Sequence, residues 1–216
     1  MKDYSDINKE AFEELAPEYN KRWEIYLKHQ EKILTPLQDY LRSTFKGPIK
    51  ILDTGCGVGL DLYLFSRKNF QTYGIDFSPR MVRYAKKNSP LSKLLVADFL
   101  HDDISGGPFH AILMDAFIHL FPQKDTTHLL EKARFLLIND GYLYIATTSQ
   151  KTRPKEKEGY FMKQDYNKPV ERFRRFWTKK ELLKIIRQSG FTIKSFYKDY
   201  EPVFKKTWMN IIAQKR

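Results

Sequence analysis

The stretch Asp53-Thr54-Gly55-Cys56-Gly57-Val58-Gly59 decides the fold of this chain. An apolar run over residues 49–53 leads into it and is typical of a short buried strand, and a helical pattern follows over residues 60–68. Glycine lets the backbone turn tightly and approach a ligand without a Cβ in the way. A helix that begins behind such a loop offers free N–H groups to an anionic group. The stretch therefore predicts a ligand-binding loop between a strand and a helix.

The most familiar loop of this kind is the dinucleotide-binding fingerprint, G-x-G-x-x-G. Counted from Gly55 and Gly57, the third glycine of that fingerprint belongs at position 60, where Leu60 stands. The pattern is instead G-x-G-x-G, and Asp53 lies two residues before its first glycine. The loop thus departs from the dinucleotide-binding pattern, and its ligand has to be inferred from other positions.

Strands and helices are expected to alternate along most of the chain. Helices between the strands predict an α/β fold, with a mostly parallel sheet and helices on both of its faces. The last helix is expected to begin at Thr178, with Glu181 completing a capping box, and to end at Gly190. No helix separates the last two strands, which are therefore expected to pair antiparallel at the sheet edge. The seven expected strands span residues 49–53, 71–76, 93–97, 109–115, 142–147, 191–197 and 207–213.

The first part of the chain is expected to be helical. From Asn8 to Thr44, apolar and aromatic side chains recur at three- and four-residue spacings, as on one face of a helix. Pro17 and Pro36 are expected to break or start helices there, because proline lacks the N–H that a helix interior uses.

Length and composition favour a single domain over residues 1–216. The one cysteine, Cys56, excludes an internal disulfide and suits a reducing compartment. No apolar run approaches the roughly 20 residues that span a bilayer, and the charged first residues do not lead into a signal-peptide core. We therefore expect a cytoplasmic protein without membrane insertion.

Positive charge is concentrated late in the chain. The formal net charge is +12, and the segment from Thr148 to Phe176 holds nine basic and four acidic residues mixed with aromatic ones. A strong positive field attracts nucleic acid, anionic lipid or phosphorylated metabolites, whereas solvated surface lysines are the simpler explanation. The basic residues are Lys151, Arg153, Lys155, Lys157, Lys163, Lys168, Arg172, Arg174 and Arg175.

Two more acidic residues follow the next two expected strands. Asp76 ends the second strand, ahead of the helix start Ser78-Pro79, and Asp98 follows the third strand. Positions 53, 76 and 98 are 23 and 22 residues apart, about the length of one strand–helix unit. All three acids are therefore expected at the carboxyl edge of the sheet, where ligands bind in such folds.

Together these motifs resemble those of class I S-adenosylmethionine-dependent methyltransferases. Residues 53–59 resemble the first motif of that family, D/E-x-G-x-G-x-G, residues 73–81 its second and residues 96–99 its third. The resemblance continues over residues 109–120 and 176–191, so it covers most of the chain, and it is greatest to the small-molecule, quinone-biosynthesis-type subgroup. It implies a Rossmann-like fold, with a seven-stranded, mostly parallel sheet and an antiparallel last strand.

The resemblance implies S-adenosylmethionine as the cofactor. Asp53 and the glycine loop are expected to hold its methionine part, and the Asp76 carboxylate can accept both ribose hydroxyls. Asp98 is expected to bind the adenine amine. Residues 1–46 are interpreted as a helical lid. The residues expected to bind the cofactor are Tyr19, Arg22, Asp53, Gly55, Cys56, Gly57, Gly59, Asp76, Phe77, Met81, Asp98, Phe99, Asp115, Ala116 and Phe117.

His119 is the candidate catalytic base, since it follows the fourth strand at the ligand edge; a structurally packed histidine is the alternative. The segment 148–176 is expected to cover the acceptor site as an insertion after the fifth strand. No spacing of His, Cys or carboxylates suggests a metal site, so no metal is expected.

The predicted function is methyl transfer from S-adenosylmethionine to an oxygen, nitrogen or carbon of a small metabolite, for which an acidic molecule is one option. Two alternatives stay open. The basic segment favours an RNA methyltransferase, and the fold alone is compatible with a non-catalytic nucleotide-binding module. The sequence predicts neither the acceptor nor the oligomeric state.

Overall fold

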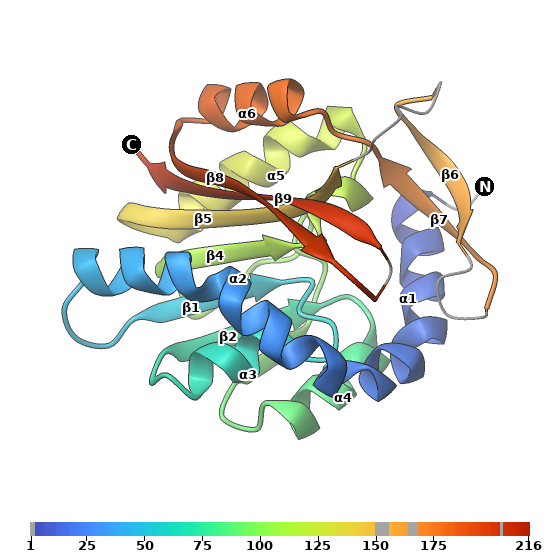
Figure 1. Ribbon diagram of the computed structural model, residues 1–216, viewed down its shortest axis with the longest axis horizontal. Coiled ribbons are helices and arrows are strands. Elements are labelled where there is room, and N and C mark those ends of the chain that lie inside the picture. Colours follow the sequence, from blue (N-terminus) through green and yellow to red (C-terminus); the bar gives the residue numbers. More distant parts are fainter. Residues whose placement is uncertain (1–2, 150–155, 164–167, 204) are drawn as a thin grey trace.

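The computed structural model describes residues 3–149, 156–163, 168–203 and 205–216. Its main sheet has seven strands in the order β3-β2-β1-β4-β5-β9-β8 (Figure 1). Along the chain these strands are β1 (Lys50–Thr54), β2 (Gln71–Asp76), β3 (Lys93–Val96), β4 (Phe109–Asp115), β5 (Leu137–Ser149), β8 (Phe191–Glu201) and β9 (Lys206–Lys215).

The directions of the strands confirm the predicted α/β fold. Strands β3, β2, β1, β4 and β5 pair in parallel, whereas β9 pairs antiparallel with both β5 and β8. The strands in the middle of the sheet are buried on both faces, which explains why they appear as continuous apolar runs in the sequence. The carboxyl ends of β1, β2 and β4 consequently meet at one edge of the sheet.

Helices cover both faces of the sheet, and each face has its own apolar core. On one face, Leu34 and Leu37 of α2 and Phe65 of α3 pack against strand residues such as Tyr144. On the other face, α5 and α6 pack against the same sheet. In the described ranges, no helix is long and apolar enough to cross a bilayer. The helices are α1 (Tyr4–Lys21), α2 (Trp23–Thr44), α3 (Leu60–Ser66), α4 (Pro79–Asn88), the 3-10 helix η1 (Ile118–Leu120), α5 (Gln123–Leu136) and α6 (Lys179–Gln188).

The predicted helix breaks at the two prolines are wrong. Pro17 lies inside α1 and Pro36 inside α2, and the chain changes direction at Arg22 instead. A proline inside a helix costs about 3 kcal/mol. The buried stripe of α2 that includes Ile33, Leu34, Leu37 and Leu41 offsets this cost, because each such side chain contributes about 1.5–3 kcal/mol on burial.

The fifth strand begins earlier than the expected residue 142 and includes residues 139–141. These residues belong to β5, which is irregular at this point, because Asp140 has a φ of 60° and the β4–β5 register shifts between Phe109 and Ala111. The capping box of α6 is present as predicted, with Thr178 and Glu181 bonding reciprocally. Gly190 follows that helix with a left-handed φ of 84°.

The basic segment contains a hairpin that sequence periodicity did not predict. Strands β6 (Glu158–Lys163) and β7 (Val170–Arg175) form a separate two-stranded sheet that lies against α1 (Figure 1). Five of the six residues of β7 are buried, so the alternation that reveals a half-exposed strand is missing. Lys151, Arg153, Lys155 and Tyr166 lie outside the described residues.

Candidate active site at the carboxyl edge of the sheet

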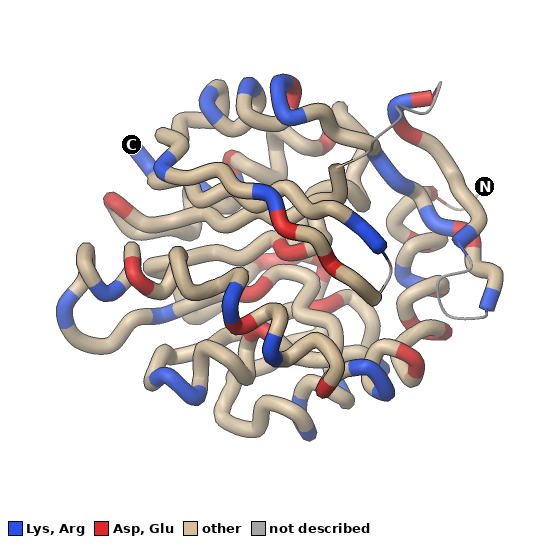
Figure 2. Tube along the Cα trace, viewed as in Figure 1, with Lys and Arg blue, Asp and Glu red and all other residues tan. Residues whose placement is uncertain are grey.

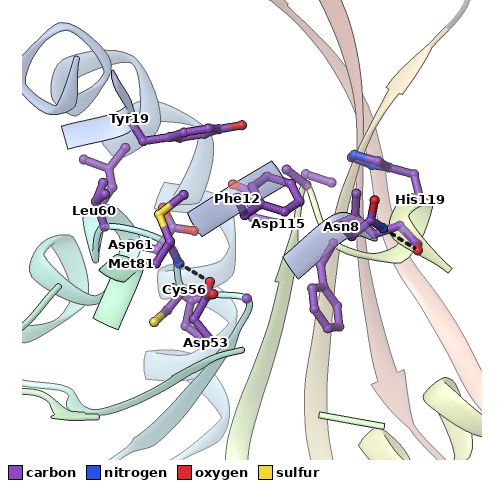
Figure 3. A pocket seen from close by; sticks show the side chains of 18 of the residues that line it. Asn8, Phe12, Tyr19, Asp53, Cys56, Leu60, Asp61, Met81, Asp115 and His119 are labelled. Atoms are coloured by element: carbon purple, nitrogen blue, oxygen red, sulfur yellow. Dashed lines mark hydrogen bonds between the residues drawn. The ribbon is translucent and has the colours of Figure 1, made fainter. Parts of the chain in front are cut away.

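A cavity of about 300 Å³ lies where β1, β2, β4 and β5 end, and α1, α2, η1, β7 and β9 also line it. This volume is at the lower end of the range for ligand pockets, roughly 300–1,000 Å³. Side chains from both halves of the chain point into it, from Tyr19 on α1 to His119 on η1 (Figure 3). Of the residues expected to bind a cofactor, all line this cavity except Arg22, at the junction of α1 and α2, and Gly59.

The glycine-rich loop leaves room for a ligand at one glycine in particular. A Cβ added at Gly57 meets nothing within 4 Å, although its φ of 51° lies in the left-handed region. At Gly55 an added Cβ would lie 2.5 Å from the Phe117 ring, and at Gly59 it would lie 3.0 Å from Ala85 Cα. Gly59 thus allows close packing of helices, whereas Gly57 opens the loop to the cavity.

The Cys56 thiol in the same loop is buried. Burial, together with the nearby carboxyls of Asp53 and Asp76, raises its pKa well above the ordinary value. The thiol therefore stays protonated at neutral pH, which makes it a poor nucleophile.

Asp76 connects β2 to the loop and to the next helix. Its carboxylate accepts hydrogen bonds from the backbone N–H groups of Gly57 and Ser78, each at 2.9 Å. Burial raises its pKa to about 6, and the two N–H donors oppose that rise. Each oxygen keeps a second lone pair, so the carboxylate retains the capacity to accept two hydroxyl groups.

Away from the glycine loop and Asp76, the cavity wall near Phe99 and Met81 is apolar except for one acidic group, Asp98. Phe99 and Phe117 lie edge-to-face, with ring centroids 6.1 Å apart, and Met81 packs with Tyr19 on the facing wall. Asp98 accepts from Leu100 N at 2.8 Å and lies 3.0 Å from His101 Nδ1.

Three carboxyls lie close together in the middle of the cavity: those of Asp53, Asp61 and Asp115. Gln30 Nε2 from α2 donates to Asp61 Oδ1 at 2.9 Å and to Asp115 Oδ2 at 2.5 Å. Burial raises the pKa of Asp115 to about 6. Burial first, and then repulsion from neighbouring carboxylates, raises the pKa values of Asp53 and Asp61. Sequence reasoning missed Asp61 and Gln30; the one signal was that Gln30 lies on the mostly apolar face of α2, on which Gln38 is also buried.

Helix α1 is fastened across the cavity by side chains that sequence reasoning also missed. Asn8 is buried; its Nδ2 donates to Leu120 O at 3.2 Å, and its Oδ1 accepts from Phe173 N at 2.9 Å. Further along the helix, Glu13 accepts from Arg80 N at 3.1 Å and from the Ser78 hydroxyl. These bonds hold α1 over the ends of β2 and β4.

Comparison with known families decides which class of protein has this site. The model of a family described as "Methyltransferase domain" matches residues 26–195, which is most of the chain.

The chain belongs to this methyltransferase family.

Its cofactor is S-adenosylmethionine, as the motif resemblance implies. Solved methyltransferases share the fold. A SAM-dependent methyltransferase from Methanosarcina mazei is 22% identical with a TM-score of 0.68, and the match covers 81% of this chain and 96% of that one. The 1,6-didemethyltoxoflavin-N1-methyltransferase of Burkholderia thailandensis is 17% identical with a TM-score of 0.67, and the match covers 100% and 91% of the two chains. The narrower resemblance to quinone-biosynthesis-type enzymes stays a prediction.

A curated relative adds a different acceptor. The tRNA N(3)-methylcytidine methyltransferase of Schizosaccharomyces pombe is 32% identical over 100 residues. The match covers 42% of this chain and 40% of that protein, so this methyltransferase spans less than half of the relative's length.

His119 of the methyltransferase lies on η1 and is buried, with its Nδ1 3.1 Å from Thr147 Oγ1. Burial, and next to it the charges of Arg174 and Arg172, hold the pKa of His119 well below its usual value. The imidazole is therefore neutral at neutral pH.

Beyond the three carboxyls, the cavity continues into a second end, named the acceptor end below, to which the sequence analysis assigned no residues. Tyr144 and Ala146 of β5, Asn210 and Trp208 of β9 and His29 of α2 line it. Asn210 lies within the apolar stretch Met209–Ile212, and this single polar residue in a buried strand is the signal that sequence reasoning overlooked.

The β7 side of the basic segment is packed inward, whereas Lys157, Tyr160 and Lys168 are about half exposed. Arg175 donates to Glu158 Oε2 at 2.5 Å and to Gln123 Oε1 at 2.8 Å, and its guanidinium lies 4.1 Å from the centre of the Trp177 ring. Arg174 donates to Thr148 Oγ1 at 2.5 Å. Among the coloured parts of the chain, several acidic residues lie near the middle of the view, and many Lys and Arg lie on the outer helices (Figure 2).

Proposed function

We propose that this methyltransferase acts on an oxygen, nitrogen or carbon of a small metabolite. One observation carries the proposal: Arg172, Arg174 and Arg175 are at most 8% exposed, and Phe173 and Trp177 beside them are buried. Contacts to RNA phosphates need cations that reach solvent, and base stacking needs exposed rings. Inward packing suits a lid over a small acceptor better than a platform for RNA.

We propose that the cofactor spans the cavity from the glycine loop to Asp98. The room at Gly57 and the spare lone pairs of Asp76 fit the methionine part and the ribose diol, and the apolar walls fit adenine. Asp115 would lie beside the sulfonium. The proposed cofactor-binding residues that line the cavity are Tyr19, Asp53, Gly55, Cys56, Gly57, Asp76, Phe77, Met81, Asp98, Phe99, Asp115, Ala116 and Phe117.

S-adenosylmethionine supplies a methyl group that its sulfonium already activates. The protein then contributes mostly alignment of the acceptor and exclusion of water, which α1 supports by covering the cavity. Where the acceptor carries a proton, a base is needed, and His119 and Asp115 are the two candidates. Both line the cavity, and Asp115, with a pKa of about 6, is the stronger base of the two.

The second candidate function is methylation of RNA. The similarity to a tRNA methyltransferase over 100 residues and the net charge of +12 favour it. One assay separates the two functions. Methyl-tritiated S-adenosylmethionine is offered with a metabolite extract and, in parallel, with total RNA. Label in the extract and not in RNA is expected.

Binding of total RNA at about 50 and 200 mM salt is the companion measurement. Contacts to six or more phosphates would cost roughly a thousandfold in affinity over this range. Weak binding that changes little with salt is expected. Tight, steeply salt-dependent binding with label in RNA would replace the metabolite proposal by the RNA one.

A further inference from the structure

Three neighbouring strands place a carboxylate and an amide on one row at the acceptor end. Asp115 of β4 is opposite Ala146 of β5, and Ala146 is opposite Asn210 of β9. Residues directly opposite one another point to the same face of a sheet. Since alanine is small, the row leaves a slot above Ala146, with Asp115 on one side and Asn210 on the other.

The Asn210 amide is incompletely bonded. This side chain is 1% exposed, and its Oδ1 accepts from the Tyr144 hydroxyl at 2.8 Å. Its Nδ2 has no hydrogen-bond partner among the described residues, and Asn210 lines the cavity. Buried donors without partners are rare in folded proteins. The free N–H therefore indicates that a ligand with a hydrogen-bond acceptor belongs beside it.

The other side of the slot accepts hydrogen bonds. Asp115 Oδ2 accepts from Gln30, and the carboxyl also bonds with Asp61 and with the backbone of Ala116. A carboxylate has about four acceptor positions, so one remains for a donor in the cavity. Neighbouring strands are about 4.8 Å apart, so Asp115 and Asn210 are about 10 Å apart along the row. This spacing refers to the backbones, and both side chains project from the same face over Ala146. A single small ring that carries both a hydrogen-bond donor and an acceptor can therefore meet both groups.

The geometry points to a cyclic amide as the methyl acceptor, a planar ring in which an N–H stands beside a carbonyl. This inference rests on the proposed function and specifies its substrate class. Asn210 Nδ2 donates to the carbonyl, and Asp115 accepts from the ring N–H. Tyr144 and Trp208 lie one step along β5 and β9 on either side of the row and bound the slot.

The transfer then has a defined path for its proton. The ring nitrogen gives an electron pair to the methyl carbon, and the bond from that carbon to sulfur breaks with its electrons left on sulfur. The N–H proton passes to the Asp115 carboxylate and from there to solvent. The products are the N-methylated cyclic amide and S-adenosylhomocysteine.

The first test compares two probes on the wild-type protein saturated with S-adenosylhomocysteine. Ligand-observed NMR titrations measure 2-pyridone, which has both groups, and 1-methyl-2-pyridone, which lacks the N–H. We expect 2-pyridone to bind about tenfold more tightly, the factor that one hydrogen bond contributes. Equal affinities, or no binding of 2-pyridone at about 20 mM, would overturn the inference.

The second test replaces the donor. Asn210→Asp keeps the shape and faces the carbonyl with an oxygen, so affinity for 2-pyridone should fall tenfold or more, while calorimetric affinity for S-adenosylhomocysteine stays within about threefold. Asn139→Asp, an exposed asparagine on the same sheet, is the matched control and should change neither. Unchanged pyridone binding in a folded Asn210→Asp protein contradicts the inference; if that variant does not fold, the two-probe comparison decides.

The two proposals fail differently. Label that enters a metabolite extract while 2-pyridone neither binds nor accepts methyl removes the cyclic-amide inference and leaves the proposed function intact. Label that enters only RNA removes the proposed function itself.

Discussion

The cofactor end and the acceptor end of the cavity are built in different ways. The cofactor end consists of loops that each directly follow a strand, so its residues form contiguous motifs such as residues 53–59 and 76–81. The acceptor end combines side chains from α2, β4, β5 and β9 whose neighbours in sequence are ordinary core residues. The cofactor end is determined by backbone geometry, and the acceptor end by strand register. Membership of a family therefore predicts the cofactor far better than it predicts the acceptor.

The largest effect should come from the group where the two ends meet. Asp115→Asn removes the proposed base but keeps a polar group next to Gln30, and kcat should fall about 100-fold or more, as expected for loss of general base catalysis. His119→Asn should lower kcat by about tenfold or less, because its low pKa makes it a weak base. Single-turnover rates with labelled cofactor measure both. A larger loss for His119→Asn would assign the base to His119.

The free energy of unfolding is expected to depend on pH through Asp76. The Asp76 carboxyl ionises with the ordinary pKa of 3.8 when unfolded and with a pKa of about 6 in the native state, a difference worth about 3 kcal/mol. Between these values the native state binds more protons, so each rise in pH favours the unfolded state, and the loss is complete above about pH 6.

The free energy of unfolding of the cofactor-free wild type should therefore fall relative to Asp76→Asn by up to about 3 kcal/mol between pH 4 and pH 7. Urea unfolding at several pH values measures the difference. Parallel curves for the two proteins would contradict the raised pKa.

The cofactor end alone should respond to Asp76→Ala. Loss of the acceptor for two ribose hydroxyls should weaken S-adenosylmethionine binding by about 1–3 kcal/mol, measured by calorimetry. Asn210→Asp is the comparison at the other end and should leave this affinity within about threefold. Equal weakening in both variants would mean that the ends are not separate sites.

The smallest effect is expected at Cys56. The thiol is buried and protonated, and the backbone of this loop, and not the side chain, faces the ligand. Cys56→Ala should keep turnover within about threefold, with at most a modest rise in the cofactor KM. Loss of turnover with cofactor binding intact would reopen covalent chemistry at this residue.

Much of the fold was predictable because its signals are local. The mostly parallel sheet with helices on both faces follows from the alternation of strands and helices, and the Thr178–Glu181 capping box marked a helix start correctly. The prolines misled because long-range burial of the α2 stripe outweighs a local backbone cost. The β6–β7 hairpin was missed because the arginines of β7 are buried. Their burial depends on tertiary contacts, such as those of Arg175 with Glu158 and Gln123, that the sequence does not reveal.

The candidate site divides in the same way. Asp53, Asp76 and Asp98 were expected at one edge, and the structure places all three on the cavity. Gln30, Asp61 and Asn210 have no motif, since their proximity depends on how α2 crosses the sheet and on the register of β9. Arg22 was expected there from its place on the first helix, but it lies at the helix junction.

With the sulfonium placed as proposed, beside Asp53, Asp61 and Asp115, ligand binding should release protons. Near pH 6 about half of the Asp115 carboxyls carry a proton, and a sulfonium placed beside them favours the charged form. Binding of S-adenosylmethionine should therefore release protons into the buffer, whereas S-adenosylhomocysteine, which lacks that positive charge, should release fewer. In the proposed arrangement the same carboxyls, which repel one another in the unliganded protein, would favour the fresh cofactor over the spent one.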